Sequence, residues 1–539
     1  MIMVPTAEQV TALPLPALRA AFSKEDRRRR YWRRPDLWAL DFVRWQVVRQ
    51  TLTPEQLEGL AAFAEHDRQA IYGPHGIGKT TEAALLILWF ADTRDQAGID
   101  WKIPTTATAW RQLTKYLWPE VHKWIGFMDW EKLGRARYTF KIELLDLNLK
   151  LAHGEAFAVA SNDHATIEGA HATQMLYIFD EAKKIPDKTF DASEGAFTGG
   201  SEAYAFAIST PEEEAGRFHA ICARKPGYED WHVRHVTKEQ AIASGRMTQA
   251  WADQRLRQWG KDSVAYQNRV LGLFTKGSAS GVIPLAWVEA AIERWLALEE
   301  TGMLPTRLTD VGADFARGGG DQMMLAPRAG NAILRLRCLD SIKDTMPAVG
   351  VIAGLVRAHP GSHAIVDVIG IGAGPYDRLV ELMDEQPDLY KHQGIDALPF
   401  NASAGCAEAK DRSGELGFIN LRSAAWWALR ERLDPEYDPD FALPPDDELI
   451  GDLTAPRWRV TSNGRIQVES KDDAFVDADG NKPQSLRQRL GRSTDRGDAA
   501  VMAAARELLR QLLAQPTGLY LSALPISVGS GASKWRDGR

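Results

Sequence analysis

The stretch IYGPHGIGKTTEAALLILWF, Ile71–Phe90, places a glycine-rich loop between a short and a longer apolar run. Residues 73–80 match the pattern G-x-x-x-x-G-K-[ST] completely. In this pattern the backbone N–H groups point at phosphate oxygens, Lys79 reaches the β- and γ-phosphates, and Thr80 offers its hydroxyl to magnesium. A chance glycine-rich turn is the weaker alternative. The residues predicted to bind the nucleotide are Gly73, Gly76, Gly78, Lys79, Thr80 and Thr81.

A buried strand that ends in two acids follows about 100 residues after the loop. The run MLYIFDEA places Asp180 where it can hold the water shell of magnesium, and Glu181 where it can polarise the water that attacks the γ-phosphate. The next strand, AYAFAIST, ends at Ser209-Thr210, whose hydroxyls could sense the γ-phosphate; a plain strand-ending turn is equally consistent. The pattern predicts nucleotide hydrolysis on a parallel α/β sheet.

A short helix is predicted before the loop. In LTPEQLEGLAAFAEHD, Thr53 can cap a helix and Pro54 suits its first position. Gln56 lies 17 residues before Gly73 and could read the adenine edge with its paired donor and acceptor. A solvated glutamine on a helix is an equally good interpretation.

Acids also end several predicted strands in the second half of the chain. Asp314 follows TDVGA, Asp367 ends HAIVD, and Asp495 and Asp498 lie three residues apart at the start of a helix in GRSTDRGDAAVMAAARELL. Each acid by itself is more often a cap or turn residue. Together they predict a nuclease site with two ions, magnesium or manganese, that activate water and stabilise the leaving 3′-oxygen of a phosphodiester.

The run DVIGIGAG, residues 367–374, superficially suggests a dinucleotide-binding loop. Its glycine spacing is wrong and its acid precedes the loop, so a tight strand-to-helix turn beside a metal ligand is the better interpretation.

Composition indicates an ordinary globular protein. The chain has 539 residues, 45% of them hydrophobic and 25% charged, with a net charge of −7, which suggests roughly two to four domains. We expect no membrane span or secretion signal, and a location in the cytoplasm. The three cysteines are too far apart for a disulfide framework or a thiolate metal site. The basic segment KEDRRRRYWRRP could contact phosphates, or could equally be a solvated or packed helix face.

The predicted fold class is α/β: a P-loop NTPase domain with a parallel sheet, followed by an α/β nuclease domain. The expected segments are an N-terminal helical segment at 1–60, the ATPase domain at 61–275, a linker at 276–305, the nuclease domain at 306–515 and a flexible tail at 516–539.

The ordered set of motifs resembles the large terminase subunit of tailed bacteriophages and prophages. The resemblance covers about residues 40 to 510 and rests on the phosphate loop with YIFDEA, STP, YQNRVLGLF, GADFARGGGD, VDVIGIGAG, INLRSAAWWALRERL and GRSTDRGDAA. It implies a ribonuclease-H-like nuclease with Asp314, Asp367 and Asp498 at the metal positions and Asp495 as the alternate. ATP and Mg²⁺ are the implied cofactors, with Mn²⁺ also suited to the nuclease.

The resemblance implies an ATP-driven motor that moves double-stranded DNA into a procapsid and cuts concatemers in the host cytoplasm. The implied partners are double-stranded DNA, the small terminase subunit, the portal and further copies in a ring, with no membrane. An arginine that completes the ATPase site is also implied, with Arg111, Arg135, Arg137 and Arg217 as candidates. The alternatives are a cellular helicase or DNA-repair ATPase with a fused nuclease domain, and a nucleotide-gated DNA-binding scaffold without catalysis.

Overall fold

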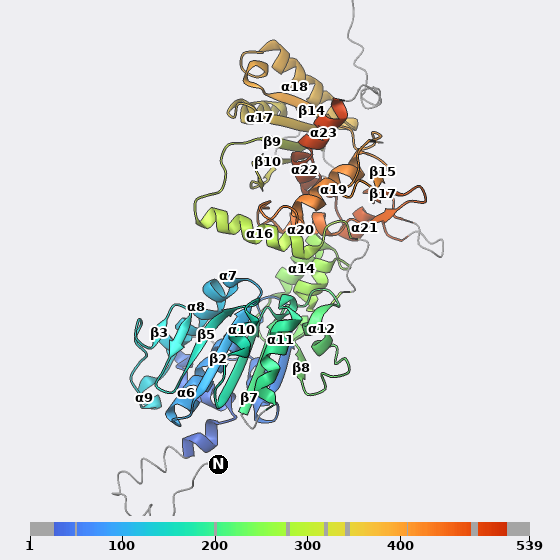
Figure 1. Cartoon of the computed structure of the whole chain (residues 1–539). Coiled ribbons are helices and arrows are strands. Elements are labelled where there is room, and N and C mark those ends of the chain that lie inside the picture. Colours follow the sequence, from blue (N-terminus) through green and yellow to red (C-terminus); the bar gives the residue numbers. More distant parts are fainter. Residues whose placement is uncertain are drawn as a thin grey trace, which may run out of the picture. The chain divides into compact units, whose positions relative to one another are not determined.

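The computed structural model describes residues 26–48, 51–198, 202–275, 281–316, 322–339, 345–406, 408–475 and 483–514. The predicted tail at 516–539 and part of the segment GADFARGGGD lie outside these residues. The chain forms two compact units, one of residues 1–252 and 267–277 and one of residues 253–266 and 278–539 (Figure 1). The chain therefore passes between the two units more than once. A division of the sequence into consecutive segments does not describe this path. No helix among the described residues is long and apolar enough to cross a membrane.

The first unit is built on an eight-stranded sheet. Its strands are β1 Arg68–Tyr72, β2 Trp101–Ala107, β3 Leu144–Leu145, β4 Asn148–Lys150, β5 Gly154–Ala160, β6 Gln174–Asp180, β7 Glu202–Ser209 and β8 His232–His235. Its helices are α3 Pro35–Phe42, α4 Trp45–Val48, α5 Pro54–Ala61, α6 Lys79–Gln96, α7 Trp110–Gln112, α8 Trp118–Phe127, α9 Trp130–Leu133, α10 His164–Glu168, α11 Asp187–Glu194, α12 Gly216–Cys222 and α13 Lys238–Ala243. Helix α14, Gln249–Trp259, follows.

The strand order is β3-β4-β5-β2-β6-β7-β1-β8. Strands β5, β2, β6, β7, β1 and β8 pair in parallel, so their carboxyl ends share one edge. The phosphate loop follows β1 and Asp180 ends β6, with β7 between them. This is the parallel sheet of a P-loop NTPase, as the sequence predicts, and it brings the two motifs to the same edge.

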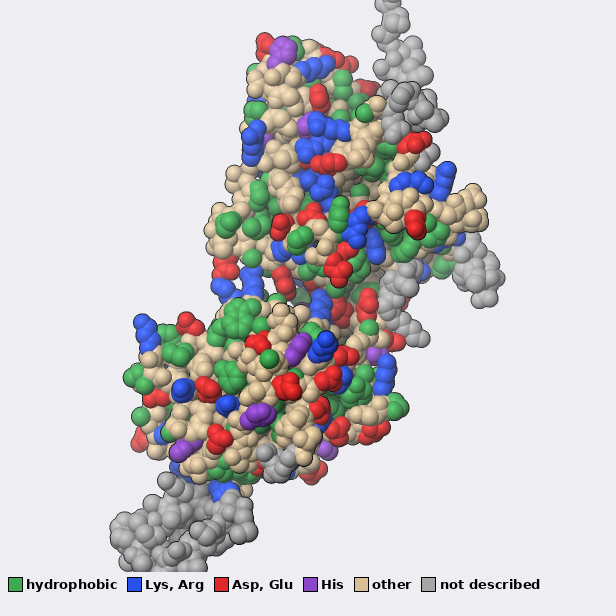
Figure 2. All heavy atoms as spheres, viewed as in Figure 1, with side chains coloured by type: hydrophobic (Ala, Val, Ile, Leu, Met, Phe, Trp, Pro, Cys, Tyr) green, Lys and Arg blue, Asp and Glu red, His purple; other side chains and the backbone are tan. Residues whose placement is uncertain are grey.

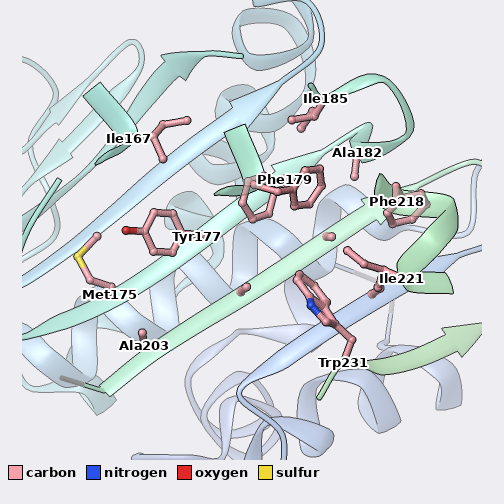
Figure 3. Packing of buried hydrophobic residues seen from close by; sticks show 14 of the residues in the cluster. Ile167, Met175, Tyr177, Phe179, Ala182, Ile185, Ala203, Phe218, Ile221 and Trp231 are labelled. Atoms are coloured by element: carbon pink, nitrogen blue, oxygen red, sulfur yellow. The ribbon is translucent and has the colours of Figure 1, made fainter. Parts of the chain in front are cut away.

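Helices cover both faces of this sheet, and alternate side chains of β6 and β7 point to opposite faces. On one face, Tyr177 and Phe179 belong to one cluster with Phe218 of α12 (Figure 3). Phe190 of α11 stacks on Phe179 in the same cluster. On the other face, Tyr204 of β7 contacts the rings of Phe63, Trp89 and Phe90 near and on α6. Asp180 is in phase with the second set, since side chains alternate, and so lies on the α6 face of β6.

The second unit contains a five-membered path of strands, β11-β10-β9-β13-β14, with β12 paired to β10. These strands are β9 Asp310–Asp314, β10 Met324–Ala329, β11 Ala332–Ile333, β12 Arg337–Cys338, β13 His363–Asp367 and β14 Asp396–Phe400. A smaller sheet joins β15 Gly417–Phe418, β17 Arg465–Val468 and β16 Trp458–Val460. The helices of the second unit are α15 Val264–Tyr266, α16 Leu285–Glu300, α17 Thr345–Arg357, α18 Ala373–Glu385, α19 Leu421–Leu433, α20 Asp447–Thr454, α21 Leu486–Leu490, α22 Asp495–Ala504 and α23 Arg506–Leu513.

In the larger sheet β10 is antiparallel to β9, while β13 and β14 are parallel to it. The predicted order, antiparallel strands first and α/β units after them, is confirmed. The fold is a ribonuclease-H-like α/β sheet, the second part of the predicted fold class. Apolar residues of α17 and α18 cover one face of β9 and β13. Helix α22 covers the other.

Gly312 explains how close α22 comes to β9. A Cβ atom at this glycine would lie 2.1 Å from the backbone oxygen of Ala499 and 2.6 Å from the nitrogen of Ala503, both on α22. Any side chain would therefore push the helix away from the strand. The absence of a side chain brings the first turn of α22 over the end of β9, where Asp314 lies.

Candidate functional site

The phosphate loop has the backbone geometry that its sequence predicts. Gly76 and Gly78 have φ angles of 78° and 86°, in the region that only glycine adopts readily. Gly73 is also required, because a Cβ atom there would lie 2.6 Å from the carbonyl oxygen of Val236. Such alternation of backbone conformation turns successive N–H groups into one concavity that fits phosphate. The loop then opens α6, whose N-terminus adds favourable polarity for an anion.

Lys79 lies buried at the start of α6. Its Nζ donates to the carbonyl oxygen of Pro74 at 2.9 Å and to Oγ1 of Thr210 at 3.2 Å. Burial lowers the pKa of Lys79 to about 8, although the carboxylates of Glu181 and Asp180 favour its charged form. The ammonium therefore bridges the phosphate loop and the end of β7, at the place where a γ-phosphate is expected.

The two neighbouring threonines differ. Thr81 donates to Glu120 Oε1 at 2.8 Å and is thereby engaged inside the protein. The hydroxyl of Thr80 makes no hydrogen bond to the residues that the structure describes and stays available to a metal ion.

Hydrogen bonds hold both the backbone and the side-chain carboxylate of Glu181. Its backbone is left-handed, with φ 49° and ψ 48°, a conformation that costs a non-glycine residue roughly 1–2 kcal/mol. Thr108 Oγ1 donates to its carbonyl oxygen at 3.0 Å, and Ser209 Oγ donates to its Oε2 at 2.9 Å. Its own N–H donates to Asp180 Oδ1 at 3.0 Å. These contacts aim the carboxylate along the edge that carries the phosphate loop.

The two acids have opposite electrostatics. Burial, together with repulsion from Glu181, raises the pKa of Asp180 to about 7. Burial acts in the same direction on Glu181, but Lys183 and Lys79 outweigh it and hold the pKa of Glu181 below its usual value. Glu181 is thus the ionised member of the pair and the better placed to polarise water.

Gln56 contacts the phosphate loop directly. Thr53 caps α5 as predicted, and Gln56 completes a capping box with it. Gln56 Nε2 donates to the carbonyl oxygen of Gly78 at 3.1 Å, and Arg246 Nη2 donates to Gln56 Oε1 at 3.0 Å. Gln56 is buried, so it is not the solvated helix residue of the alternative interpretation. Arg246 is not one of the four arginines that the sequence suggests for the ATPase site, because no motif surrounds it in the sequence.

Two of the four candidate arginines are held by ion pairs. Arg135 makes ion pairs with Asp92 and Asp95, and Arg217 with Asp191, so both contact residues of the first unit.

The basic segment at 27–34 makes several ion pairs within the protein. Arg30, Arg33 and Arg34 pair with Asp41, Asp67 and Asp36, respectively. These contacts favour the packed alternative for that segment.

In the second unit, three predicted acids surround one lysine that no sequence motif marks. Lys471 Nζ lies 2.9 Å from Asp498 Oδ2, 3.3 Å from Asp495 Oδ1 and 3.6 Å from Asp314 Oδ2. Burial opposes its charge, but these carboxylates raise the pKa of Lys471 above its usual value. Asp498 and Asp495 reach it from the first turn of α22, and Asp314 from the end of β9.

Asp498 has four donors. Oδ1 accepts from Arg422 Nη1 at 2.7 Å and from Trp426 Nε1 at 3.3 Å; Oδ2 accepts from Thr494 Oγ1 at 2.9 Å, besides Lys471. Burial alone would raise its pKa, but Lys471 and Arg422 hold the pKa of Asp498 well below its usual value. Asp495 has fewer partners, Lys471 and the N–H of Gln322 at 2.6 Å.

Asp314 and Asp367 are less well compensated. Burial raises the pKa of Asp314 well above its usual value; Lys471 opposes this, and repulsion from Asp498 and Asp495 adds to it. Asp314 Oδ2 is buried without a hydrogen-bond partner among the described residues. Burial likewise raises the pKa of Asp367 to about 6, although Asp367 Oδ1 accepts from the N–H of Ile369 at 2.9 Å.

The turn after Asp367 is as tight as predicted. Gly370 has φ 63°, and a Cβ atom at Gly372 would lie 1.9 Å from the carbonyl oxygen of Asp367. These glycines let the chain fold back beside the acid and do not form a dinucleotide loop.

The charge of this carboxylate cluster suits a divalent cation. Two buried and two partly buried carboxylates interact with one another and with Lys471. Asp314 Oδ2 faces Lys471 without a hydrogen bond from the described residues, and a carboxylate oxygen is a hard ligand. Among the described residues, no three Asp, Glu, His or Cys side chains converge as ligands of one metal ion. Lys471 instead supplies the positive charge at the centre of the cluster.

Residues that sequence reasoning missed support the predicted ones. Lys471 and Arg422 hold Asp498, and Asp452 accepts from the N–H of Gly497 in the first turn of α22 at 2.9 Å. Burial raises the pKa of Asp452 to about 7. No spacing rule connects these residues with the acids they hold, because they come from separate elements.

Comparisons with known proteins point to one family. No family model matches the chain. It is 29% identical over 135 residues to a protein described as a probable large terminase subunit of Enterobacteria phage P7. This match covers 24% of the chain and 26% of that relative, so the chain spans about a quarter of its length.

Solved structures of the same description are also similar. The nuclease domain of the large terminase subunit gp2 of bacterial virus Sf6, a mutant form with manganese and beta-thujaplicinol, is 22% identical with a TM-score of 0.32, over 41% of this chain and 97% of that one. The large terminase of a thermophilic bacteriophage is 13% identical with a TM-score of 0.39, over 85% and 100%. The same thermophilic terminase in complex with ADP is 12% identical, with a TM-score of 0.37, over 85% and 100%. The sequence relative from phage P7 confirms the resemblance of this chain to large terminase subunits that its motifs predict.

Proposed function

We propose that the chain is an ATP-driven DNA-packaging motor with a metal-dependent endonuclease. The observation that carries the proposal is that one chain holds both clusters in separate units: the phosphate loop with Lys79, Asp180 and Glu181 in the first, and a carboxylate cluster, three of whose members pair with Lys471, in the second. A plain nucleotide-binding protein does not need the second cluster, and a plain nuclease does not need the first.

In the first unit ATP is the proposed substrate. The loop N–H groups and Lys79 bind its phosphates, and Thr80 and Asp180 hold its magnesium. Glu181, ionised and anchored by Ser209 and Thr108, orients the attacking water. Lys79 bonds Thr210 next to Ser209, so a change in phosphate occupancy alters contacts at the end of β7. These links supply a route from the γ-phosphate to a moving element.

In the second unit Asp314, Asp367 and either Asp495 or Asp498 are the proposed metal ligands. Magnesium or manganese bound there would activate water and stabilise the leaving 3′-oxygen of a phosphodiester. Asp314 contributes a carboxylate oxygen that lacks a hydrogen-bond partner in the described part of the protein. Lys471 and Arg422 neutralise part of the cluster and keep Asp498 in place.

The proposed partners are double-stranded DNA, a small terminase subunit, a portal on a procapsid and further copies of this chain in a ring, all in the host cytoplasm. The test is ATP-dependent displacement of a third strand from a triplex on duplex DNA, compared with unwinding of a forked duplex by the same preparation. A packaging motor displaces the third strand and leaves the fork paired. Unwinding of the fork would favour a cellular helicase or DNA-repair ATPase instead.

A further inference from the structure

A basic groove lies in the second unit between the end of α14 and the end of α21. Its volume is about 670 Å³. Its charged and polar lining includes Arg257, Gln258, Lys261, Glu448, Arg489 and Arg492. None of the four predicted nuclease acids lines it.

Three of the five charged residues in the groove are already compensated. Arg489 Nη1 pairs with Glu469 Oε1 at 2.7 Å, Arg492 pairs with Asp452, and Glu448 Oε2 pairs with Arg496 Nε at 2.7 Å. Arg257 and Lys261 are exposed, and neither side chain has an ion pair or hydrogen bond to the part of the chain that the structure describes. The groove therefore presents two uncompensated positive charges.

The walls of the groove are fixed against each other. Gly260, with φ 77°, ends α14 so close to α21 that a Cβ atom there would lie 2.2 Å from the carbonyl oxygen of Arg489. Arg492 Nη2 donates to the carbonyl oxygen of Gln258 at 2.8 Å and to that of Glu448 at 3.0 Å. A ligand would meet a preformed surface and would not have to order it.

The groove adjoins the carboxylate cluster. Arg492 precedes Asp495 by three residues, so their Cα atoms are at most about 11 Å apart. Asp452, the partner of Arg492, also accepts from the N–H of Gly497 in the first turn of α22. Along the axis of B-DNA, where each strand carries one phosphate about every 3.4 Å, this separation corresponds to about three phosphates.

We propose that this groove binds the sugar-phosphate backbone of duplex DNA a few nucleotides from the bond to be cut, an inference that rests on the proposed function. A guanidinium and an ammonium without partners are the groups that bind phosphodiester oxygens. No aromatic residue lines the groove, so it offers no platform on which a base could stack. Figure 2 shows Lys and Arg side chains interspersed with Asp and Glu on the visible face. In the proposal, the local pair of cations Arg257 and Lys261 recognises the phosphates.

The test measures binding of the full-length chain to a mixed-sequence duplex in EDTA over a series of salt concentrations. The double variant Arg257→Gln/Lys261→Gln removes two phosphate contacts, and the slope of log K against log salt should become shallower by about 2. The control is Arg337→Gln/Arg357→Gln, which also removes two exposed cations of the second unit that have no partner among the described residues. The control should keep the wild-type slope.

A slope in Arg257→Gln/Lys261→Gln equal to that of the control would overturn the groove assignment. A wild-type chain that did not bind duplex DNA at any salt concentration would instead overturn the proposed function, and the groove with it. The thermal unfolding of each variant, compared with that of the wild type, reports that both variants are folded.

Discussion

Ser209 Oγ donates a hydrogen bond of 2.9 Å to Glu181 Oε2, so the end of β7 positions the carboxylate that follows β6. Ser209→Ala should lower kcat for ATP hydrolysis by about tenfold, corresponding to roughly 1.4 kcal/mol, because Glu181 loses the donor that aims it. KM should change little, since the Ser209 hydroxyl bonds Glu181 and the carbonyl oxygen of Thr210 and no group of the phosphate loop among the described residues. Steady-state ATPase kinetics provide the measurement.

Ser193→Ala is the matched control for that change. Ser193 is a buried serine of α11 in the same unit, and its hydroxyl bonds only the carbonyl oxygen of Phe190 among the described residues. A kcat in Ser209→Ala no lower than in Ser193→Ala would show that Ser209 does not position Glu181.

Asp314 and Asp498 should respond in opposite ways to the same substitution. Asp314→Asn removes a carboxylate whose ionisation the fold disfavours, so we expect the apo protein to gain roughly 1 kcal/mol of stability. Asp498→Asn removes a carboxylate held by Lys471 and Arg422, so we expect a loss of roughly 2 kcal/mol. Thermal unfolding in EDTA measures both, and equal shifts of the same sign would contradict the assigned electrostatics.

Loss of metal ligands should be visible in cleavage. Asp314→Asn or Asp367→Asn should abolish plasmid nicking in magnesium or manganese while the protein stays folded. Asp495→Asn should impair nicking less than Asp498→Asn. A folded Asp314→Asn protein that nicked at the wild-type rate would remove Asp314 from the site.

Lys471 should act as a partial substitute for metal charge. Lys471→Ala leaves Asp314, Asp495 and Asp498 without their shared cation, so the variant should melt at a lower temperature in EDTA. Magnesium or manganese should restore more stability to this variant than it adds to the wild type. Equal stabilisation of both proteins by metal would show that the lysine and the metal do not share these carboxylates.

Glu82 makes stability depend on pH. Burial raises its pKa from 4.5 to about 8, even though Arg234 Nη1 lies 3.8 Å from its Oε2. Between these values the folded protein binds more protons than the unfolded chain, so this residue's contribution to stability falls as pH rises. The melting temperature of Glu82→Gln relative to wild type should therefore increase from pH 5 to pH 8.5. A difference that stayed constant or decreased over this range would contradict the buried neutral state.

The sequence predicted the elements that carry the motifs because their signals are local. The phosphate loop, the strand before Asp180 and the helix that begins at Asp495 each rest on a contiguous pattern of apolar and glycine residues. Parallel pairing then fixes which strand ends meet, so Lys79 and Glu181 could be placed together before any coordinates.

The supporting residues could not be predicted in this way. Lys471 lies in the run VESKDD, where an exposed charge is the ordinary expectation. The three aspartates that surround it meet only because α22 packs on β9 at Gly312. Arg246 reaches Gly78 through Gln56, a link between residues 190 positions apart. Neither relationship leaves a periodic or spacing signal in the sequence.

In the proposed function, one chain contains two separable reaction centres. The most direct measurement follows ATP hydrolysis and metal-dependent plasmid nicking on the same preparations of wild type, Lys79→Ala and Asp314→Asn. We expect Lys79→Ala to lose about 100-fold or more of the ATPase rate and to keep nicking, and Asp314→Asn to keep the ATPase and to lose nicking. Loss of both activities in either folded variant, or retention of both, would contradict it.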